Sequence, residues 1–342
     1  MTFDYLICAR KRAGTAFIAE PGPLQFIKVA SGAATYTPAE VIPPKQWAAE
    51  VQGLADGDEN PNSISPSGDV LIFVHGFNND IASVIARTGE LRTTLKSQGW
   101  HGTVVAFDWP SGNNVLNYVE DRMDATGVAG QLVGSGLKLL MAGQKAGCVT
   151  NVHLLGHSTG AYVILEAFAQ AQKDGTSFSS PWRIGQVALI AGDVSVDSLR
   201  ASASWSQPMF QRINRLTNYS NGHDAVLAVS NAKRVGVSPR VGRKGLPADA
   251  DAKAVNVDCT AHFGTLKPGA GADFAYTHSW HFRDPRFCLD LALTLEGAID
   301  RAAIPTRTLG AHGLWLNEDG TRPAHQADWG IKEAARYLQP RA

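Results

Sequence analysis

The sequence predicts an α/β protein whose mostly parallel sheet is covered by helices on both faces and is preceded by an antiparallel portion. Between residues 70 and 299, short continuous apolar runs alternate with longer segments in which apolar residues recur at helical spacing. Strands that alternate with helices pair in parallel, and the helices then cover both faces. Before residue 70, three β-like runs with turn residues between them favour an antiparallel start.

Residues 1–69 are expected to form N-terminal β segments and a connection. The runs at 3–9, 14–20 and 24–30 are separated by Ala13-Gly14 and by Pro21-Gly22-Pro23, residues typical of turns. A polar stretch at 52–69 is rich in Gly, Pro, Asn and Ser and is expected to connect to the main domain along the surface. The N-terminus lacks the long apolar region and cleavage site of a secretory signal, so a cytoplasmic location is expected.

Residues 70–299 are expected to form one core domain, because nothing in that range resembles an interdomain linker. The C-terminal extension, residues 300–342, contains Trp315 and Trp329 and is expected to pack on this core. The predicted strands are 70–74, 103–107, 149–155, 186–191, 215–220 and 255–259, and the predicted helices are 81–100, 118–143, 159–172 and 285–299.

The charge balance gives no electrostatic reason to expect a nucleic acid or an anionic membrane as partner. Lys and Arg total 31, Asp and Glu total 31, and the formal net charge is zero. No uncharged apolar stretch reaches the roughly 18 residues that span a bilayer, so no stable membrane insertion is expected. A small-molecule substrate is the natural expectation, and the oligomeric state stays open.

The four cysteines give no sign of a metal site. They stand singly, without a C-x-x-C pair and without ligand-like spacing to histidine. They are expected to be reduced core residues, and no metal is predicted. The cysteines are Cys8, Cys148, Cys259 and Cys288.

The stretch Leu-Leu-Gly-His-Ser-Thr-Gly-Ala-Tyr-Val, residues 154–163, places Ser158 between a predicted strand and a predicted helix. A G-x-S-x-G motif is weak evidence alone, but in this setting a sharp turn exposes the serine hydroxyl above the carboxyl end of a parallel sheet. A serine nucleophile needs a base, and the base needs an orienting acid. Ser158 is therefore the candidate nucleophile.

The acid and the base should follow the serine in that order along the chain. Asp224 lies just past the predicted strand 215–220, and His278 lies after the last core strand and before the closing helix. Asp193 is the alternative acid, because it follows the preceding strand. His262 and His281 occupy the same loop region as His278 and are its rivals.

Two backbone N–H groups are candidates for binding the oxyanion that forms on a substrate. The turn His-Gly-Phe-Asn-Asn-Asp, residues 75–80, follows the first core strand, and Gly76 allows the backbone to approach the substrate. The N–H of Phe77 is the first candidate. The N–H of Thr159, at the start of the helix after the serine, is the second.

Taken together, the chain resembles the bacterial esterase/lipase-superfamily α/β-hydrolases, most of which are described as of unknown function. The resemblance rests on residues 71–78, 104–122, 152–163, 219–230 and 278–280, and Trp109-Pro110-Ser111 followed by Tyr118 and Asp121 is its most specific part. It implies an α/β-hydrolase fold with Ser158 as nucleophile, Asp224 as acid and His278 as base. The chain departs from the group at Thr159 and Ala161, where Met and Asn are common, and in its terminal extensions.

The expected function is hydrolysis of a carboxylic ester through an acyl-enzyme on Ser158, without a metal or an organic cofactor. Two alternatives remain at this point. An amidase or peptidase would use the same three residues. A non-catalytic binding protein of the same fold would normally have lost one of them, and all three are present. Acyl chain length, alcohol moiety and physiological role stay open.

Overall fold

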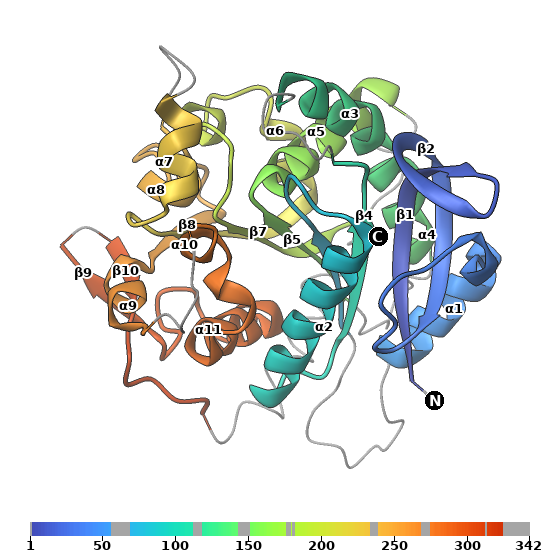
Figure 1. The fold of residues 1–342 in the computed structure, drawn as a ribbon. Helices are drawn as coiled ribbons and strands as arrows, with labels where there is room; N and C mark the ends of the chain where they lie inside the picture. The colour runs from blue at the N-terminus through green and yellow to red at the C-terminus, as the bar shows by residue number, and fades with distance from the viewer. Residues whose placement is uncertain are drawn as a thin grey trace.

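The computed structural model describes residues 2–55, 69–111, 118–142, 151–175, 179, 182–232, 239–267, 274–311 and 313–323. Ten strands form one sheet in the order β2-β1-β4-β3-β5-β6-β7-β8-β10-β9 (Figure 1). All pairs from β1–β4 to β8–β10 are parallel, and the pairs at the two edges, β1–β2 and β9–β10, are antiparallel. The strands are β1 (Phe3–Ala13), β2 (Ala16–Ala30), β3 (Asp69–Val74), β4 (Thr103–Asp108), β5 (Asn151–His157), β6 (Ile184–Ile190), β7 (Ile213–Ser220), β8 (Ala254–Asp258), β9 (Arg307–Gly310) and β10 (Gly313–Leu316).

Helices cover both faces of this sheet, as the alternation of apolar runs predicted. Alternate residues of β3 face opposite layers: Ile72 belongs to the core beneath the layer of α1, α3, α4, α5 and α6, whereas Phe73 belongs to the core beneath α2 and α11 (Figure 1). The helices are α1 (Pro44–Ala55), α2 (Ile81–Ser97), α3 (Tyr118–Gln131), α4 (Lys138–Met141), α5 (Thr159–Asp174), α6 (Gln207–Arg212), α7 (Ala225–Ala232), α8 (Val241–Lys244), α9 (Thr260–Thr265), α10 (Tyr276–Ser279) and α11 (Pro285–Glu296), with a π-helical segment, η2 (Leu132–Leu137), and short 3₁₀ segments η1 (Pro38–Glu40), η4 (Val196–Leu199) and η5 (Trp280–Phe282). Among these described helices, none has an apolar stretch long enough to cross a bilayer.

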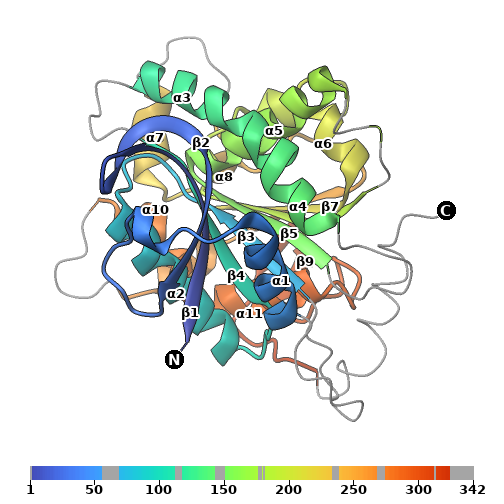
Figure 2. The ribbon, with the colours of Figure 1, turned by 90° about the vertical axis from the view of Figure 1, so that its right-hand side faces the viewer.

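The N-terminal portion differs from the sequence prediction of three β runs. It is one long hairpin, and β2 continues through Pro21-Gly22-Pro23, where a turn was expected (Figure 2). Arg10 pairs with Pro21, and the register shifts on both sides of Arg10, so this site is a bulge. Because β2 is an edge strand, a proline without an N–H removes no bond that the sheet needs.

Two other boundaries also differ from the prediction. The polar connection was placed at 52–69, but α1 extends to Ala55, and residues 56–68 lie outside the described part of the chain. The strand predicted at 149–155 covers Asn151–His157, which brings Gly156 and His157 into the sheet.

At the other edge, β10 pairs with β8, so residues 313–316 extend the sheet. Cys148 and Trp329 lie outside the described residues.

Candidate active site

Ser158 lies in a strained turn between β5 and α5. Its φ of 54° and ψ of −122° place a non-glycine residue in a backbone region that costs energy. Space requires both glycines of the motif: a Cβ at Gly160 would lie 2.1 Å from the carbonyl oxygen of Val74, and a Cβ at Gly156 would lie 2.9 Å from Cδ1 of Ile164 and 3.0 Å from Cα of Ala161. The Gly-x-Ser-x-Gly pattern therefore has a steric cause in this fold.

Backbone hydrogen bonds from neighbouring segments hold this turn in place. The N–H of Ser158 donates to the carbonyl oxygen of Ile190 over 3.1 Å. The carbonyl oxygen of Ser158 accepts from the N–H groups of Asp193 at 3.0 Å and Ala161 at 3.1 Å. These bonds offset the cost of the positive φ, and they tie the serine to the end of β6.

Asp224 and His278 are brought together at the carboxyl end of the sheet by the turn before α7 and by the short helix α10. Asp224 precedes α7, and its Oδ2 lies 2.7 Å from Nδ1 of His278 in α10. The other carboxylate oxygen, Oδ1, accepts from the N–H of Leu227 at 2.9 Å, which fixes the orientation of the carboxylate. Both residues are buried, and Asp224 is only 1% exposed.

The helix that carries His278 is tied to the turn that carries Asp224 by further hydrogen bonds. Oγ1 of Thr277 accepts from the N–H of Ala225 at 3.1 Å. The backbone carbonyl of His278 accepts from Nε2 of His157, 3.0 Å away. Burial, together with the nearby His278 ring and the Arg87 guanidinium, lowers the pKa of His157 well below its usual value. His157 is thus neutral and a donor here, a role that its position in the motif did not reveal.

The alternative candidates have other partners. Asp193 forms a buried ion pair with Nε of Arg240 at 3.0 Å. His262 lies between two carboxylates, with Nε2 2.9 Å from Asp284 and Nδ1 2.6 Å from Glu318. His281 is buried and stacks on the Trp280 ring, 4.1 Å between centroids. His278 is therefore in contact with Asp224, whereas Asp193 is paired with Arg240.

Phe77 lies in the turn of residues 75–79, which we call the β3–α2 loop. The side chain of Asn79 donates to the carbonyl oxygens of Gly76 and Phe77, both at 2.9 Å. The N–H of Asn79 donates to Oγ of Ser111 at 3.1 Å. Nε1 of Trp109 donates to the carbonyl oxygen of His75 at 2.8 Å. Ser111 and Trp109 of the Trp-Pro-Ser motif therefore hold this loop, whereas the side chains of Tyr118 and Asp121 lie outside the described part of the chain.

A buried polar network lies beneath the β3–α2 loop and was missed by sequence reasoning. Its centre is Asp108, which is fully buried and accepts from Nε of Arg10 at 2.8 and 2.9 Å and from the hydroxyl of Tyr36. Arg10 also donates to the carbonyl oxygen of Asn79 at 2.8 Å. Nε2 of His75 lies 3.1 Å from the Asp108 carboxylate. The N-terminal hairpin thus reaches the candidate site through Arg10.

The protonation of this network follows from its contacts. Burial alone would raise the pKa of the Asp108 carboxyl, but the contact with His75 and the charge of Arg10 outweigh burial and lower the pKa to about 2. Asp108 is therefore ionised at neutral pH, and the network carries a paired negative charge.

Thr159 is the first residue of α5, a helix of 16 residues. The first N–H groups of a helix have no acceptor within the helix, and the helix dipole makes this end electropositive. Within the described residues, no group of three or more His, Cys, Asp or Glu side chains could hold a metal ion.

The family comparison matches residues 60–257 to the alpha/beta hydrolases of unknown function (DUF900). This is more than half of the chain. The chain belongs to this family. No protein of curated function matches it. The fold and the family together make the chain an α/β hydrolase, and the mostly parallel sheet predicted from the sequence is confirmed.

Solved structures that resemble this hydrolase include esterases, at low identity. A hyperthermophilic esterase from Pyrobaculum calidifontis is 11% identical, with 74% of this chain and 90% of that chain covered and a TM-score of 0.36. Esterase B from Lactobacillus rhamnosis is 15% identical, with 69% and 78% covered and a TM-score of 0.38. Similarity at this level does not extend to activity or substrate.

Proposed function

We propose that this hydrolase cleaves carboxylic esters, with Ser158 as nucleophile, His278 as general base and Asp224 as the acid that orients the base. The observation that carries the proposal is the 2.7 Å contact between Oδ2 of Asp224 and Nδ1 of His278. The backbone carbonyl of His278 also accepts a hydrogen bond from His157, the residue directly before the strained Ser158. A carboxylate at Nδ1 selects the tautomer whose Nε2 can accept a proton.

The reaction begins when His278 Nε2 takes the proton of the Ser158 hydroxyl and the oxygen attacks the ester carbonyl. The carbonyl π electrons move to the oxygen and form a tetrahedral oxyanion. When this intermediate collapses, the C–O bond to the alcohol breaks, and His278 gives its proton to the leaving oxygen. A water molecule then loses a proton to His278 and attacks the acyl-enzyme, which releases the carboxylic acid and returns the proton to Ser158.

Asp224 stabilises the imidazolium that forms in each half of this reaction. It keeps its own negative charge throughout, and its second oxygen stays bonded to the N–H of Leu227. The N–H groups of Phe77 and Thr159 are assigned to the oxyanion. The contacts of Asn79 and Ser111 support this assignment for Phe77, because they fix the loop in which it lies. One such donor typically contributes about 100- to 1,000-fold to kcat.

The test compares variants on a short-chain nitrophenyl ester. Ser158→Ala and His278→Gln should each lose more than about 1,000-fold in kcat, as loss of a triad member does elsewhere. His262→Gln is the matched control, because it removes a buried histidine with carboxylate partners from the same region. Equal activity of Ser158→Ala and wild type would sink the assignment. Matched ester and amide substrates, assayed side by side, separate an esterase from an amidase or peptidase.

A further inference from the structure

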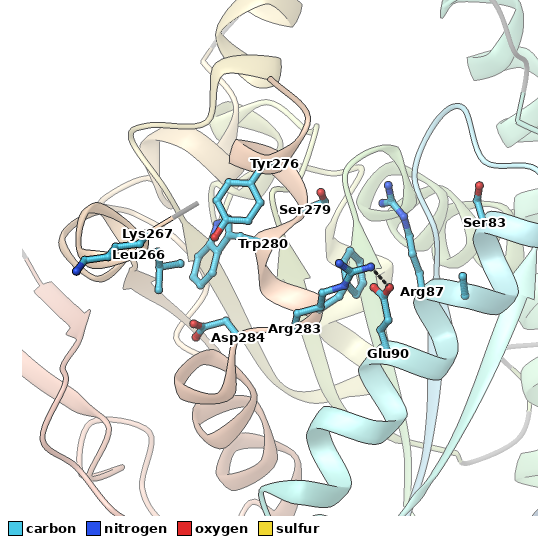
Figure 3. A pocket seen from close by; sticks show the side chains of 12 residues that line it. Ser83, Arg87, Glu90, Leu266, Lys267, Tyr276, Ser279, Trp280, Arg283 and Asp284 are labelled. Atoms are coloured by element: carbon cyan, nitrogen blue, oxygen red, sulfur yellow. Dashed lines mark hydrogen bonds and ion pairs between the residues drawn. The ribbon is translucent and has the colours of Figure 1, made fainter. Parts of the chain in front are cut away.

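A pocket of about 520 Å³ lies between α2 and the segment that runs from α10 to the start of α11 (Figure 3). Figure 3 shows the side chains of Ser83, Arg87 and Ser279 at one end of the pocket. Arg283 and Glu90 lie below Arg87, and Lys267 and Asp284 lie toward the other end. The lining is therefore rich in charge, and the question is which of these charges are already paired.

The acidic residues of the pocket are committed to other groups. Glu90 pairs with Arg283, as the dashed line in Figure 3 marks. Asp284 caps α11 by accepting from the N–H of Phe287 at 2.7 Å, and it also contacts His262 at 2.9 Å. In the part of the chain that the structure describes, the Arg87 guanidinium has neither a carboxylate nor a hydrogen-bond partner. Lys267 also lines the pocket without a described carboxylate partner, but it is exposed to solvent, whereas Arg87 is half-buried. Arg87 is therefore the half-buried cation of the lining that lacks a carboxylate in direct contact.

Arg87 is also held in a fixed and partly dry position. Its guanidinium lies over the Phe282 ring, 5.5 Å from the centroid. Burial lowers the pKa of Arg87, and the nearby Glu90 opposes this change, but an arginine remains charged at neutral pH. A partly desolvated cation without a carboxylate in direct contact favours binding of an anion, because folding has already removed part of the water around the cation.

Phe282, which lines the pocket, is linked to the proposed general base through the ring of His157. Phe282 packs edge-on against His157, 5.1 Å between centroids, and His157 donates to the backbone carbonyl of His278. Ser279, which follows His278 directly, lines the pocket. In the proposed reaction His278 donates a proton to the leaving oxygen of the ester. The alcohol part of the ester, which carries this oxygen, therefore lies on the side of His278.

We propose that this pocket binds an anionic carboxylate on the alcohol part of the substrate, with Arg87 as its partner. The inference rests on the proposed ester hydrolysis and narrows its substrate class to esters of acid-bearing alcohols or phenols. The planar guanidinium matches the two oxygens of a carboxylate, and the hydroxyls of Ser83 and Ser279 lie at the same end of the pocket.

The experiment compares 4-acetoxybenzoate with 4-acetoxybenzamide, two acetyl esters of nearly equal shape that differ in charge. Wild type should prefer the anion. Arg87→Gln should lower the ratio of the two kcat/KM values by about tenfold or more, mainly through KM of the anion, since a bond between charged groups is lost. Arg87→Lys should retain part of the preference. A ratio unchanged in Arg87→Gln would overturn the proposal.

Arg92→Gln is the matched control, because it removes the same charge from the same helix. Arg92 pairs with Asp4 and does not line the pocket. Its ratio should stay within about twofold of wild type, since charges at the surface are screened over about 10 Å. A loss as large as that in Arg87→Gln would refute a specific site and indicate a general effect of net charge.

A binding measurement separates this inference from the proposed function. Calorimetric titration with 4-hydroxybenzoate, the product anion, requires no turnover. Binding that is weakened about tenfold or more in Arg87→Gln supports the pocket even if neither ester is hydrolysed. Equal binding to wild type and Arg87→Gln refutes the pocket even if both esters are good substrates.

Discussion

Replacing Tyr36 by Phe removes one hydroxyl from the buried network beneath the β3–α2 loop and leaves the rest of the side chain. The hydroxyl donates to Asp108, while Arg10 continues to donate to the same carboxylate. A hydrogen bond to a charged group contributes about 1.5–3 kcal/mol to stability. A domain is typically stable by about 5–15 kcal/mol, so the variant should remain folded.

The loss should also reach the proposed reaction through the loop. Asp108 contacts His75, and Arg10 bonds to the carbonyl oxygen of Asn79, so a shift of this carboxylate moves both ends of the loop that contains Phe77. Complete loss of one oxyanion donor costs about 100- to 1,000-fold in kcat. A displaced donor should cost less. We expect kcat to fall by about tenfold, or about 1.4 kcal/mol, with KM little changed.

The matched control is Tyr219→Phe. The hydroxyl of Tyr219 donates to Asp290 at 2.7 Å, and Asp290 is paired with Arg307 in the same manner as Asp108 with Arg10. The hydroxyl of Tyr219 also contacts Thr294 and Arg307, so urea unfolding should show a loss of stability in Tyr219→Phe at least as large as in Tyr36→Phe. Only Tyr36→Phe should lose kcat and, in proportion, affinity for a trifluoromethyl ketone, which forms an oxyanion when serine adds to it.

Two results would refute this reasoning. If both variants lose kcat equally, the effect follows from stability and not from the loop. If Tyr36→Phe loses stability but neither kcat nor affinity for the ketone, the network is structural only and Phe77 is held without it.

Three further predictions follow from the same geometry. Ser158→Gly should be more stable than Ser158→Ala by about 1 kcal/mol in thermal denaturation, because glycine relieves the positive φ; equal stabilities would show that the turn is unstrained. Asp224→Asn should lower kcat by about 10,000-fold and Asp193→Asn far less, and the reverse order in steady-state assays would transfer the acid to Asp193. The carboxyl of Asp108 has a pKa of about 2 in the folded protein and about 3.9 in the unfolded chain. Its ionised form therefore stabilises the folded protein above pH 4, and this stabilisation is lost as the pH falls toward 2. Acid titration of Asp108→Asn should lack this loss of about 2 kcal/mol, and an unchanged acid transition would contradict the pKa.

Much of the fold could be predicted because the core strands are buried on both faces. Such strands are continuous apolar runs, and all six predicted core strands are present, with ends displaced by up to two residues. The N-terminal hairpin was mispredicted at Pro21, because proline is typical both of turns and of edge strands and only the sheet order decides between them.

The candidate site was predictable where chain order carries information. The order serine, acid, histidine allowed Asp224 and His278, with Asp193, His262 and His281 as alternatives, and the structure places Asp224 and His278 in contact. Sequence could not reveal Arg10 or Tyr36, which are 98 and 72 residues from Asp108, because contacts across such separations leave no periodicity or spacing. The Arg87 pocket could not be predicted for the same reason, since whether a charge is paired depends on neighbours from α2 and from the segment that precedes α11.

The pairing of β1 with β4 decides what counts as the folding unit. The segment shared with the family begins at residue 60, after the whole N-terminal hairpin. A chain that started there would expose β4 as a sheet edge and leave the Asp108 carboxylate in an apolar setting without its guanidinium. Removing one partner of a buried ion pair costs about 3–5 kcal/mol, and open edges invite aggregation. The hairpin is therefore expected to be indispensable for a soluble enzyme, although the segment that defines the family does not include it.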